Sequence, residues 1–388
     1  MEYIKLKDVS VHIKDGDWIE SKDQSSEGIR LIQTGNIGEG RYIDKIDKAK
    51  FISDETFENL KCTEIFENDI LISRLPSPVG RACLVPKIDG RAITAVDCTI
   101  LKIDESKCLP KYFIYYSMSE RYKRQIEKFV VGSTRVRISR KNLETIEVGV
   151  PSIEKQEKIV EVLDKAQSLI DKKREQIELL DELVKSRFVE MFGDPVLNTK
   201  EWEVKKVIDV CECMVPGRDK PKSFTGDIPW ITIDDLKINR VTYKSKSDLG
   251  LTDDEIKEVK RKKIPKGSVL MSCVGNLGIC SIAGEDMIIN QQLHSFQCKE
   301  INNYFLMYYL GFRKDYMESK ASSTTVLYMN KTVCNSIPVY LPPIELQNEF
   351  AEFVEQTDSI RSKMEASLSE LEDNFNSLMQ KAFKGELF

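Results

Sequence analysis

The chain has 388 residues, 31% of them charged, and a net charge of −5 at pH 7. This length predicts two or three domains, and no apolar run reaches the roughly 18 residues that a membrane-spanning helix needs. Met1–Ser10 is too charged for a signal peptide, so we expect a cytoplasmic protein without a membrane partner. Ten cysteines without a C-x-x-C pair, and two histidines, favour reduced thiols over structural zinc.

Residues 1–150 combine short β-rich runs with a few helices, which predicts an α+β globule. One basic stretch in it, Arg121–Lys141, holds eight Lys or Arg and one Glu. Local basicity on a near-neutral chain is compatible with nucleic-acid binding. Charge alone is equally compatible with an ordinary solvated face, so it does not establish a ligand.

Residues 151–194 predict a long helix with a coiled-coil seam. Apolar residues recur at alternating spacings of four and three over about five heptads. The pattern ends near a glycine, in Phe192–Asp194. Lys173 and Arg187 interrupt the seam, which consists of Ile159, Leu163, Ala166, Ile170, Ile177, Leu180, Val184 and Met191.

Residues 195–341 predict a second α+β globule, and residues 342–388 predict a second long helix. The globule carries another basic run, Lys257–Lys266, with six Lys or Arg and one Glu. The helix ends near the glycine of Phe383–Gly385. Its seam consists of Phe350, Phe353, Thr357, Ile360, Met364, Leu371, Phe375, Leu378 and Ala382.

The two helices open on related segments, PSIEKQEKIVEVLDKAQSL at 151–169 and PPIELQNEFAEFVEQTDSI at 342–360. The segments lie 191 residues apart and are identical at six of nineteen positions. Weaker similarities relate the globules, for example Asn68–Ser73 and Gly267–Ser272. If the helices pair antiparallel, the chain ends lie close together and the chain has an approximate two-fold axis. Helices of about 55 Å, at 1.5 Å per residue, would then hold two similar globules apart.

No catalytic motif of the sequence is complete. The glycines of Gly35–Arg41 lack the Lys and Ser or Thr of a phosphate-binding loop, and residues 341–344 lack the polar residue of an adenine methyltransferase motif. Asp194, Glu203 and Lys205 have a spacing found in magnesium nucleases, but so short a pattern arises by chance. We therefore favour a binding protein without an active site. The alternatives are a stand-alone DNA methyltransferase or nuclease, and a coiled-coil scaffold that binds no nucleic acid.

The order of globules and helices, the two P-x-I-E-x-Q openings and the segment Ser186–Pro195 resemble the specificity subunit of a type I restriction–modification system. The resemblance covers essentially the whole chain. It implies two target recognition domains, at 1–150 and 195–341, and conserved spacer helices at 151–194 and 342–388. Each domain would read one half of a bipartite site in double-stranded DNA.

The resemblance also implies partners and cofactors. Two modification subunits would bind S-adenosylmethionine and methylate adenine N6, one on each strand. Two restriction subunits would act with ATP and Mg²⁺. The chain would carry no catalytic residue, metal or cofactor of its own, and a methylation-only system without restriction subunits is compatible with the same sequence.

We expect the DNA contacts just before the last strand of each globule. In the first globule Arg135 and Arg137 would share one strand face and can bond guanine or phosphate; a solvated strand without ligand is the alternative. Val326 stands at the second-globule position of Arg135, so the site should be asymmetric. The candidates are Gly132, Ser133, Thr134, Arg135, Arg137, Arg140 and Lys141, and then Ser323, Thr324, Thr325, Tyr328, Asn330 and Lys331. Secondary candidates are Arg74, Arg81, Lys220, Lys222 and Lys260–Lys263, whereas Trp18 and Trp230 are expected in the core or at the rim.

Overall fold

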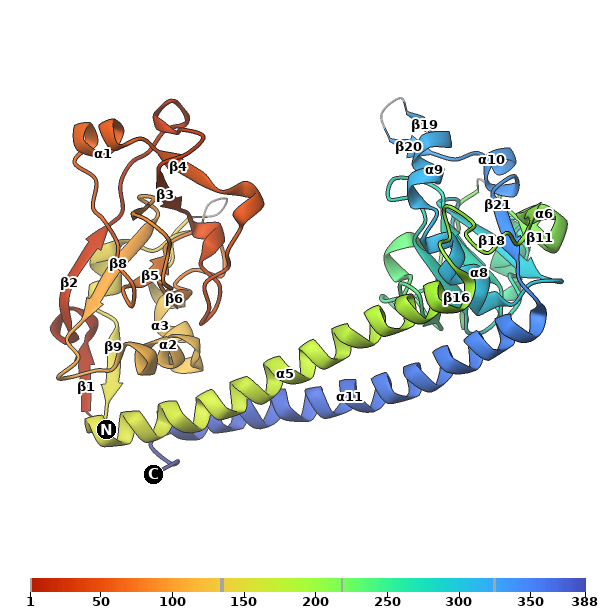
Figure 1. Cartoon of the computed structure of the whole chain (residues 1–388). Helices are drawn as coiled ribbons and strands as arrows, with labels where there is room; N and C mark the ends of the chain where they lie inside the picture. Colours follow the sequence, from red (N-terminus) through yellow and green to blue (C-terminus); the bar gives the residue numbers. More distant parts are fainter. Residues whose placement is uncertain (1, 133–135, 218, 324–325) are drawn as a thin grey trace. The chain divides into compact units, whose positions relative to one another are not determined.

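The computed structural model describes residues 2–132, 136–217, 219–323 and 326–388. The chain forms two compact units: the first unit consists of residues 1–173 and 367–388, and the second unit of residues 174–366. Each unit therefore holds one globule and part of both long helices (Figure 1). Both globules mix sheets and helices, which confirms the predicted α+β class. Within the described ranges, no helix has both the length and the apolarity of a membrane span.

Three sheets build the globule of the first unit. β1 (Glu2–Lys5) pairs antiparallel with β9 (Glu147–Val150), the strand that leads into α5 (Ile153–Phe192). The main sheet has the order β2 (Ser10–Asp15), β8 (Cys98–Ile103), β5 (Ile70–Ser73) and β6 (Ala82–Leu84). The third sheet has the order β4 (Lys50–Ile52), β3 (Ile29–Ile32) and β7 (Ala92–Thr94), with β3 and β7 parallel.

Helix α2 (Pro110–Met118) lies at the centre of this globule. It buries Tyr112 and Tyr116, whose hydroxyls donate to the carbonyl oxygens of Gly149 and Glu147 at 2.6 and 2.7 Å. Both rings pack against Phe383 of α11 (Ile344–Lys384), with ring centres 5.5 and 5.4 Å apart. The remaining helices are α1 (Asp54–Leu60), α3 (Glu120–Phe129) and α4 (Arg140–Glu144), and short 3-10 helices lie at Leu6–Val9, Ser21–Asp23, Thr34–Asn36 and Ile46–Lys48.

The second unit repeats this order of elements, which explains the weak similarity between the two globules. Besides the ribbon β19–β20 given below, its sheets are β10 (Glu203–Lys206) with β21 (Pro338–Leu341); β11 (Cys211–Met214), β18 (Leu293–Cys298), β15 (Val269–Ser272), β16 (Cys280–Ala283) and β13 (Val241–Thr242); and β14 (Gly250–Leu251), β12 (Ile228–Ile231) and β17 (Ile288–Ile289). Its short helices are α6 (Val207–Val210), α7 (Asp253–Glu258), α8 (Asn303–Gly311), α9 (Lys314–Lys320) and α10 (Lys331–Asn335), with a 3-10 helix at Ile233–Asp235. A small ribbon, β19 (Ser322–Ser323) and β20 (Leu327–Tyr328), lies between α9 and α10.

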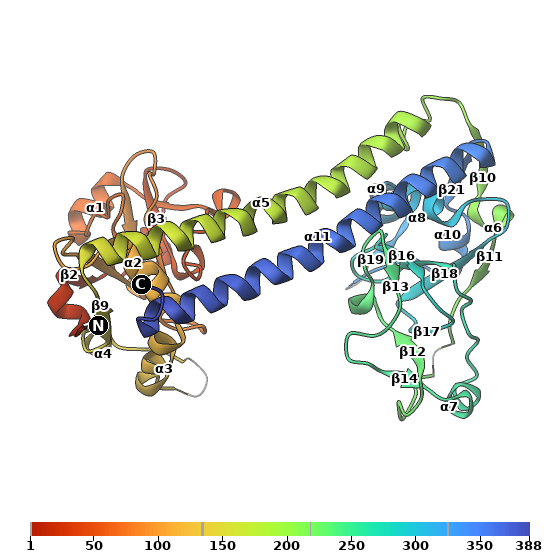
Figure 2. The same ribbon diagram turned by 90° about the horizontal axis from the view of Figure 1, so that it is seen from below.

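In each unit the two long helices run antiparallel and side by side (Figures 1 and 2). In the first unit the start of α5 meets the end of the chain, where Lys155 Nζ donates to the carbonyl oxygen of Phe388 over 3.4 Å. Because Glu2 pairs with Val150 just before α5, both chain ends lie near this point. In the second unit Arg187 of α5 pairs with Glu349 of α11 at 3.0 Å.

Both helices stop where the sequence predicts. Gly193 follows α5 with a φ of +80°, and Gly385 follows α11 with a φ of +81°. Glycine adopts this left-handed conformation without the steric penalty that a Cβ atom brings. The glycine after each helix therefore marks its end in the sequence and in the structure.

The glutamine of the repeated P-x-I-E-x-Q opening joins each helix to its globule. Gln156 is fully buried; its amide accepts from the Leu109 N–H at 2.8 Å and donates to the carbonyl oxygen of Pro151 at 2.9 Å. The amide of Gln347 makes the same two bonds: it accepts from the Asn302 N–H and donates to the carbonyl oxygen of Pro342, each at 2.8 Å. The repeated motif thus makes the same attachment twice.

We expect Gln156→Leu to destabilise the first unit by about 1–3 kcal/mol, because it leaves a buried N–H and a buried carbonyl without partners. Urea unfolding followed by circular dichroism measures the loss. Glu157→Leu, at the exposed neighbouring position, should change stability by less than about 0.5 kcal/mol. Equal stability of the two variants would contradict the role given to the buried glutamine.

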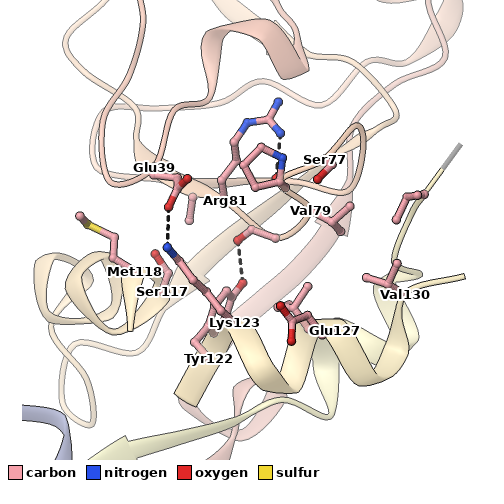
Figure 3. A pocket seen from close by; sticks show the side chains of 15 residues that line it. Glu39, Ser77, Val79, Arg81, Ser117, Met118, Tyr122, Lys123, Glu127 and Val130 are labelled. Atoms are coloured by element: carbon pink, nitrogen blue, oxygen red, sulfur yellow. Dashed lines mark hydrogen bonds and ion pairs between the residues drawn. The ribbon is translucent and has the colours of Figure 1, made fainter. Parts of the chain in front are cut away.

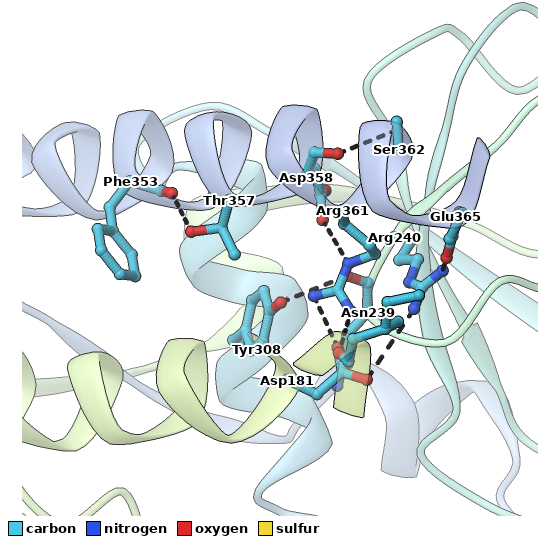
Figure 4. A network of polar contacts seen from close by, with 11 residues as sticks. Asp181, Asn239, Arg240, Tyr308, Phe353, Thr357, Asp358, Arg361, Ser362 and Glu365 are labelled. Atoms are coloured by element: carbon cyan, nitrogen blue, oxygen red, sulfur yellow. Dashed lines mark hydrogen bonds and ion pairs between the residues drawn. The ribbon is translucent and has the colours of Figure 1, made fainter. Parts of the chain in front are cut away.

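Arg361 occupies the place in the seam of α11 that the sequence pattern assigned to Ile360. The side chain of Ile360 is 48% exposed and that of Arg361 only 2%, so this part of the predicted seam is wrong. The Arg361 guanidinium lies 2.8 Å from Asp181 of α5 and 3.4 Å from Asp358 of its own helix (Figure 4). A buried charge with partners therefore replaces an apolar contact at this level of the helix pair.

Arg240 ties the globule of the second unit to the same network. Its guanidinium lies 2.8 Å from Glu365 of α11 and 3.9 Å from Asp181 of α5 (Figure 4). The loop before β13 is thus attached to both long helices through charged groups.

Candidate nucleic-acid interface

Arg74 and Arg81 bound the loop between β5 and β6 of the first unit, and both point their guanidinium groups into the protein. Arg74 lies 3.7 Å from the carboxylate of Asp15 and donates to the carbonyl oxygen of Val96. Arg81 donates four hydrogen bonds of 2.5–2.9 Å to backbone carbonyls, those of Thr34, Ile37, Pro76 and Pro78. Burial lowers the pKa of Arg81 from its ordinary value. These side chains shape the loop, and their contact with DNA stays a prediction.

In the predicted contact segment Gly132–Lys141, Ile138 lies against this loop. Three of its predicted DNA contacts, Ser133, Thr134 and Arg135, lie outside the described residues. On either side of them Val131 and Arg137 exchange two backbone hydrogen bonds of 3.0 Å each. We call the described residues 131–132 and 136–137 the first ribbon.

The two described residues at the end of the first ribbon differ in exposure. Arg137 is exposed, and Ile138 is fully buried. The Ile138 N–H donates to the carbonyl oxygen of Arg74 at 3.2 Å, which holds the ribbon on the loop. Gly132, with a φ of +105°, is exposed at the other side of the ribbon.

Arg140 and Lys141 begin α4. The Arg140 guanidinium lies 3.4 Å from Glu144 and 3.8 Å from Asp15, so Asp15 is shared between Arg140 and Arg74. Lys141 is exposed. Of the described basic candidates in the first unit, Arg137 and Lys141 extend most freely toward a ligand.

A cavity of about 270 Å³ lies between the loop after β5 and helix α3 (Figure 3). Tyr122 donates to the carbonyl oxygen of Gly80 at 2.9 Å, and Lys123 pairs with Glu39 at 2.8 Å. Gly80 has a φ of +83°, and a Cβ atom there would lie 2.9 Å from the side chain of Ile126. The loop can therefore pack on α3 only with glycine at this position.

The second unit has an equivalent ribbon, formed by Ser322, Ser323 and residues 326–328, which we call the second ribbon. Ser322 pairs with Tyr328 and Ser323 with Leu327, whereas the predicted contacts Thr324 and Thr325 lie outside the described residues. The Gly275 N–H donates to the carbonyl oxygen of Leu327 at 2.8 Å. The ribbon therefore lies against the loop that follows β15, as the first ribbon lies against the loop that follows β5.

The predicted contacts near the second ribbon have different environments. Tyr328 is 46% exposed. Asn330 accepts from the Val333 N–H at 3.0 Å and so caps α10. Lys331 begins α10 and is exposed. Tyr328 and Lys331 are thus available to a ligand, and Asn330 has a structural bond of its own.

Lys220 and Lys222 lie in the separate loop between β11 and β12. Both are exposed, and Lys222 pairs with Glu258 at 2.9 Å, which raises the pKa of Lys222. Arg261, in the basic run, is 7% exposed and donates to the carbonyl oxygens of Asp219 and Ile289. This arginine holds the loop in place, so the run Lys260–Lys263 is not a uniform basic surface.

The two tryptophans expected in the core or at the rim differ in exposure. Trp230 is 6% exposed, and the Arg261 guanidinium lies 4.8 Å from its ring, which confirms a core position. Trp18 is 70% exposed and its Nε1 donates to Glu20 at 3.3 Å, so it is not a core residue.

The sequence interpretation missed the loop Cys273–Gly278, which contains no charged residue. Its backbone repeats that of Arg74–Gly80: Gly278 N–H donates to the carbonyl oxygen of Ser272 at 3.1 Å, as Gly80 N–H donates to that of Ser73 at 2.8 Å. The similarity of Asn68–Ser73 and Gly267–Ser272 just before the two loops is the signal that points to it.

The carboxylate pattern of a nuclease has a local structural explanation. Asp194 Oδ1 accepts from the N–H groups of Val196 and Leu197, at 2.7 and 2.8 Å, and so caps the turn after α5. Lys205 lies 3.8 Å from Glu203 within β10. In the part of the chain that the structure describes, no group of three or more His, Cys, Asp or Glu side chains is arranged to hold a metal ion.

Comparison with known proteins identifies the repeated unit. Residues 1–179 and 199–373 each match the model of the type I restriction modification DNA specificity domain. The MjaIX specificity subunit of Methanocaldococcus jannaschii, a type I restriction enzyme subunit, is 27% identical over 190 residues, which are 46% of this chain and 43% of that protein. The HindI specificity subunit of Haemophilus influenzae is 24% identical over 200 residues, or 48% and 42%. The matches thus span less than half the length of these relatives.

Two solved structures share the fold along almost the whole chain. A chain from work on the complex assembly and conformational transition of the type I R-M system has a TM-score of 0.61 and 16% identity, and the match covers 100% of this chain and 98% of that one. The S subunit of a type I restriction–modification system from M. genitalium has a TM-score of 0.54 and 15% identity, with 98% and 96% covered. Identities this low show the fold alone. Because the family model matches both halves and most of their residues, the chain belongs to the type I restriction modification DNA specificity domain family.

Proposed function

We propose that this chain is the DNA-recognition subunit of a type I restriction–modification complex and reads a bipartite, asymmetric site. The observation that carries the proposal is the duplicated pair of ribbon and loop. The backbone bond from Ile138 to the loop of the first unit recurs from Met329 to Cys273 in the second, at 3.2 and 3.0 Å. The side chains at equivalent ribbon positions differ, with Arg137 in one unit and Tyr328 in the other. One scaffold with two sets of side chains suits two different half-sites.

In the proposed mechanism each ribbon lies in the major groove of the DNA, which is wide enough for a two-stranded β-ribbon. Exposed lysines beside the ribbons, such as Lys141 and Lys331, would contact phosphates and set the position on the duplex. The outward side chains of the ribbons would contact base edges, and an arginine can bond guanine O6 and N7 together. The chain would bind and orient DNA, and the chemical steps would belong to its partners.

We expect Arg137→Ala to weaken DNA binding by about 1–3 kcal/mol if its guanidinium bonds a guanine edge. The loss should be confined to changes in one half-site, because the other half contacts the second unit. Lys331→Ala should behave as the loss of a phosphate contact. The affinity for all DNA sequences should fall by the same factor, and the slope of log affinity against log salt concentration should fall by about one. Fluorescence anisotropy with the modification subunit present, on variants of each half-site and at several salt concentrations, separates the two cases.

Lys87→Ala is the matched control, since this exposed lysine follows β6 at the end of the strand away from the ribbon. It should leave affinity and sequence preference unchanged. If Arg137→Ala has the same affinity as the unaltered chain on every duplex, the first ribbon does not read DNA.

We further propose that two modification subunits dock on the long helices. The two related helix openings end at Leu169 and Ile360, equivalent positions that are 54% and 48% exposed. Their neighbours Ile170 and Arg361 are 2% exposed, so the aliphatic side chains point away from the seam. Leu169 lies in the first unit and Ile360 in the second, so the repeat places equivalent positions in both units, which suits one partner copy per unit. Two restriction subunits, acting with ATP and Mg²⁺, would complete a cleaving complex in the cytoplasm.

Native mass spectrometry tests this stoichiometry. The unaltered chain should carry two modification subunits, Leu169→Asp and Ile360→Asp should each carry one, and the double variant none, because a buried carboxylate opposes an apolar interface. Lys158→Asp, at an exposed position of α5, should still carry two. One partner on the unaltered chain, or two on both single variants, would contradict the two-site arrangement. Labelled S-adenosylmethionine should be retained only when the modification subunit is present.

A further inference from the structure

The second ribbon presents an apolar face to solvent. Val326 is 53% exposed and Tyr328 is 46% exposed. Val326 lies two residues before Tyr328 of β20, and the residue between them packs inward, so the two exposed side chains share one face. Leu327 between them packs against the core of the unit. Val326 lies beside Gly275: its Cγ1 would be 3.9 Å from a Cβ atom added to that glycine.

Cations flank this apolar face. Lys320 ends α9 just before the ribbon, and Lys331 begins α10 just after it. Both are exposed, and among the described residues neither forms an ion pair, although Lys320 Nζ lies 5.9 Å from the ring of Tyr316. Residues 322–328 themselves carry no charge. An apolar surface formed by Val326 and Tyr328 between two positive groups is complementary to base edges between two phosphate backbones.

The side chains of the second ribbon limit which base it can recognise. Guanine offers two acceptors to the major groove, which suit the guanidinium of Arg137 in the first unit. The Ser and Thr residues of residues 322–325 can bond to any base edge and so do not select one. Val326, by contrast, cannot donate a hydrogen bond and offers only an apolar surface. Thymine is the base whose major-groove edge carries an apolar group, the C5 methyl.

We propose that the second ribbon reads thymine through its C5 methyl group, with Val326 as the contacting side chain and Tyr328 packed beside it. This inference rests on the proposed recognition of DNA and specifies its chemistry in one half-site. Val326 would determine specificity, and Lys320 and Lys331 would hold the ribbon in the groove.

Deoxyuridine tests the inference, because it differs from thymidine only by this methyl group. The full chain, assembled with its modification subunits, is titrated with duplexes in which each thymine of the recognised site is replaced singly. We expect Kd to rise about three- to fivefold at one or two positions of a single half-site, the loss typical of one buried methyl group. With Val326→Ala, the thymine and uracil duplexes should bind equally well at those positions. Ile208→Ala, an exposed aliphatic residue of α6 in the same unit, should keep the difference.

Two results would overturn the inference while leaving DNA recognition intact. In one, the complex binds its site but no uracil replacement changes Kd. In the other, Val326→Ala weakens thymine and uracil duplexes by the same factor, as expected for an apolar side chain that wedges between bases without reading a methyl. Failure of the unaltered complex to bind any duplex would overturn the proposed function, and this inference with it.

Discussion

Phe188→Ala should destabilise the second unit by about 3–5 kcal/mol, the range for removing a buried phenyl ring. Phe188 lies on α5 and is 1% exposed. Its ring centre lies 5.4 Å from that of Phe305 in α8 and 5.3 Å from that of Phe350 in α11. A single ring thus joins both long helices to the globule, and its loss leaves a cavity that three separate elements cannot easily close.

Tryptophan fluorescence during urea unfolding reports this change directly. Trp202 Nε1 donates to the carbonyl oxygen of Phe192, one turn from Phe188, at 2.9 Å. Val189→Ala is the control, because Val189 is the next residue and is 43% exposed; it should shift stability by less than about 0.5 kcal/mol. A loss below 1 kcal/mol for Phe188→Ala would show that the helices do not depend on this cluster.

Arg361→Leu should cost the second unit about 3–5 kcal/mol at pH 7, as is typical when one partner of a buried ion pair is removed. The variant leaves Asp358 without its guanidinium partner in a site where burial already raises the pKa of this carboxyl. The folded state therefore favours the protonated form of Asp358, and the contribution of this group to stability falls as pH rises through its folded pKa. Without Arg361 that pKa should rise further, so the loss should be smaller at pH 5 than at pH 7.

Two further variants test this explanation. Arg361→Leu combined with Asp358→Asn should remove the extra pH dependence, because the carboxyl is gone. Lys363→Leu, at an exposed position two residues away, should change stability by less than about 0.5 kcal/mol. A pH-independent loss in Arg361→Leu would place its cause in packing and would contradict the electrostatic explanation.

Under the proposed function these two sites would matter for recognition, because they attach the globule of the second unit to the long helices. Arg240 reaches from the loop before β13 to Asp181 and Glu365, one on each long helix. A ribbon can discriminate between bases only if its support stays in place when it meets the groove. Variants that loosen the attachment should therefore lose sequence preference before they lose general affinity for DNA, which depends mainly on phosphate contacts.

Repetition in the sequence predicted the architecture. Two similar helix openings, each ahead of a long apolar stripe and a terminal glycine, were sufficient to predict globule, helix, globule and helix. The reason is physical: the buried glutamine, here Gln156 and Gln347, must satisfy the same backbone groups in both copies. The glycines after the helices, Gly193 and Gly385, must adopt a positive φ. Such local requirements leave a recognisable residue at a fixed position.

The tertiary structure decided which polar residues face inward. Arg74, Arg81 and Arg361 look like surface cations in the sequence, yet each directs its guanidinium to carbonyl or carboxylate groups that lie far away along the chain. Ile360 was expected in the seam and is exposed, because hydrophobic periodicity cannot detect that a paired arginine fills the neighbouring position. The loop Cys273–Gly278 carries no charge, and its backbone bonds to the second ribbon show its place beside Val326 and Tyr328. Burial of a charged group depends on partners distant in sequence, and a single sequence does not show which of them meet.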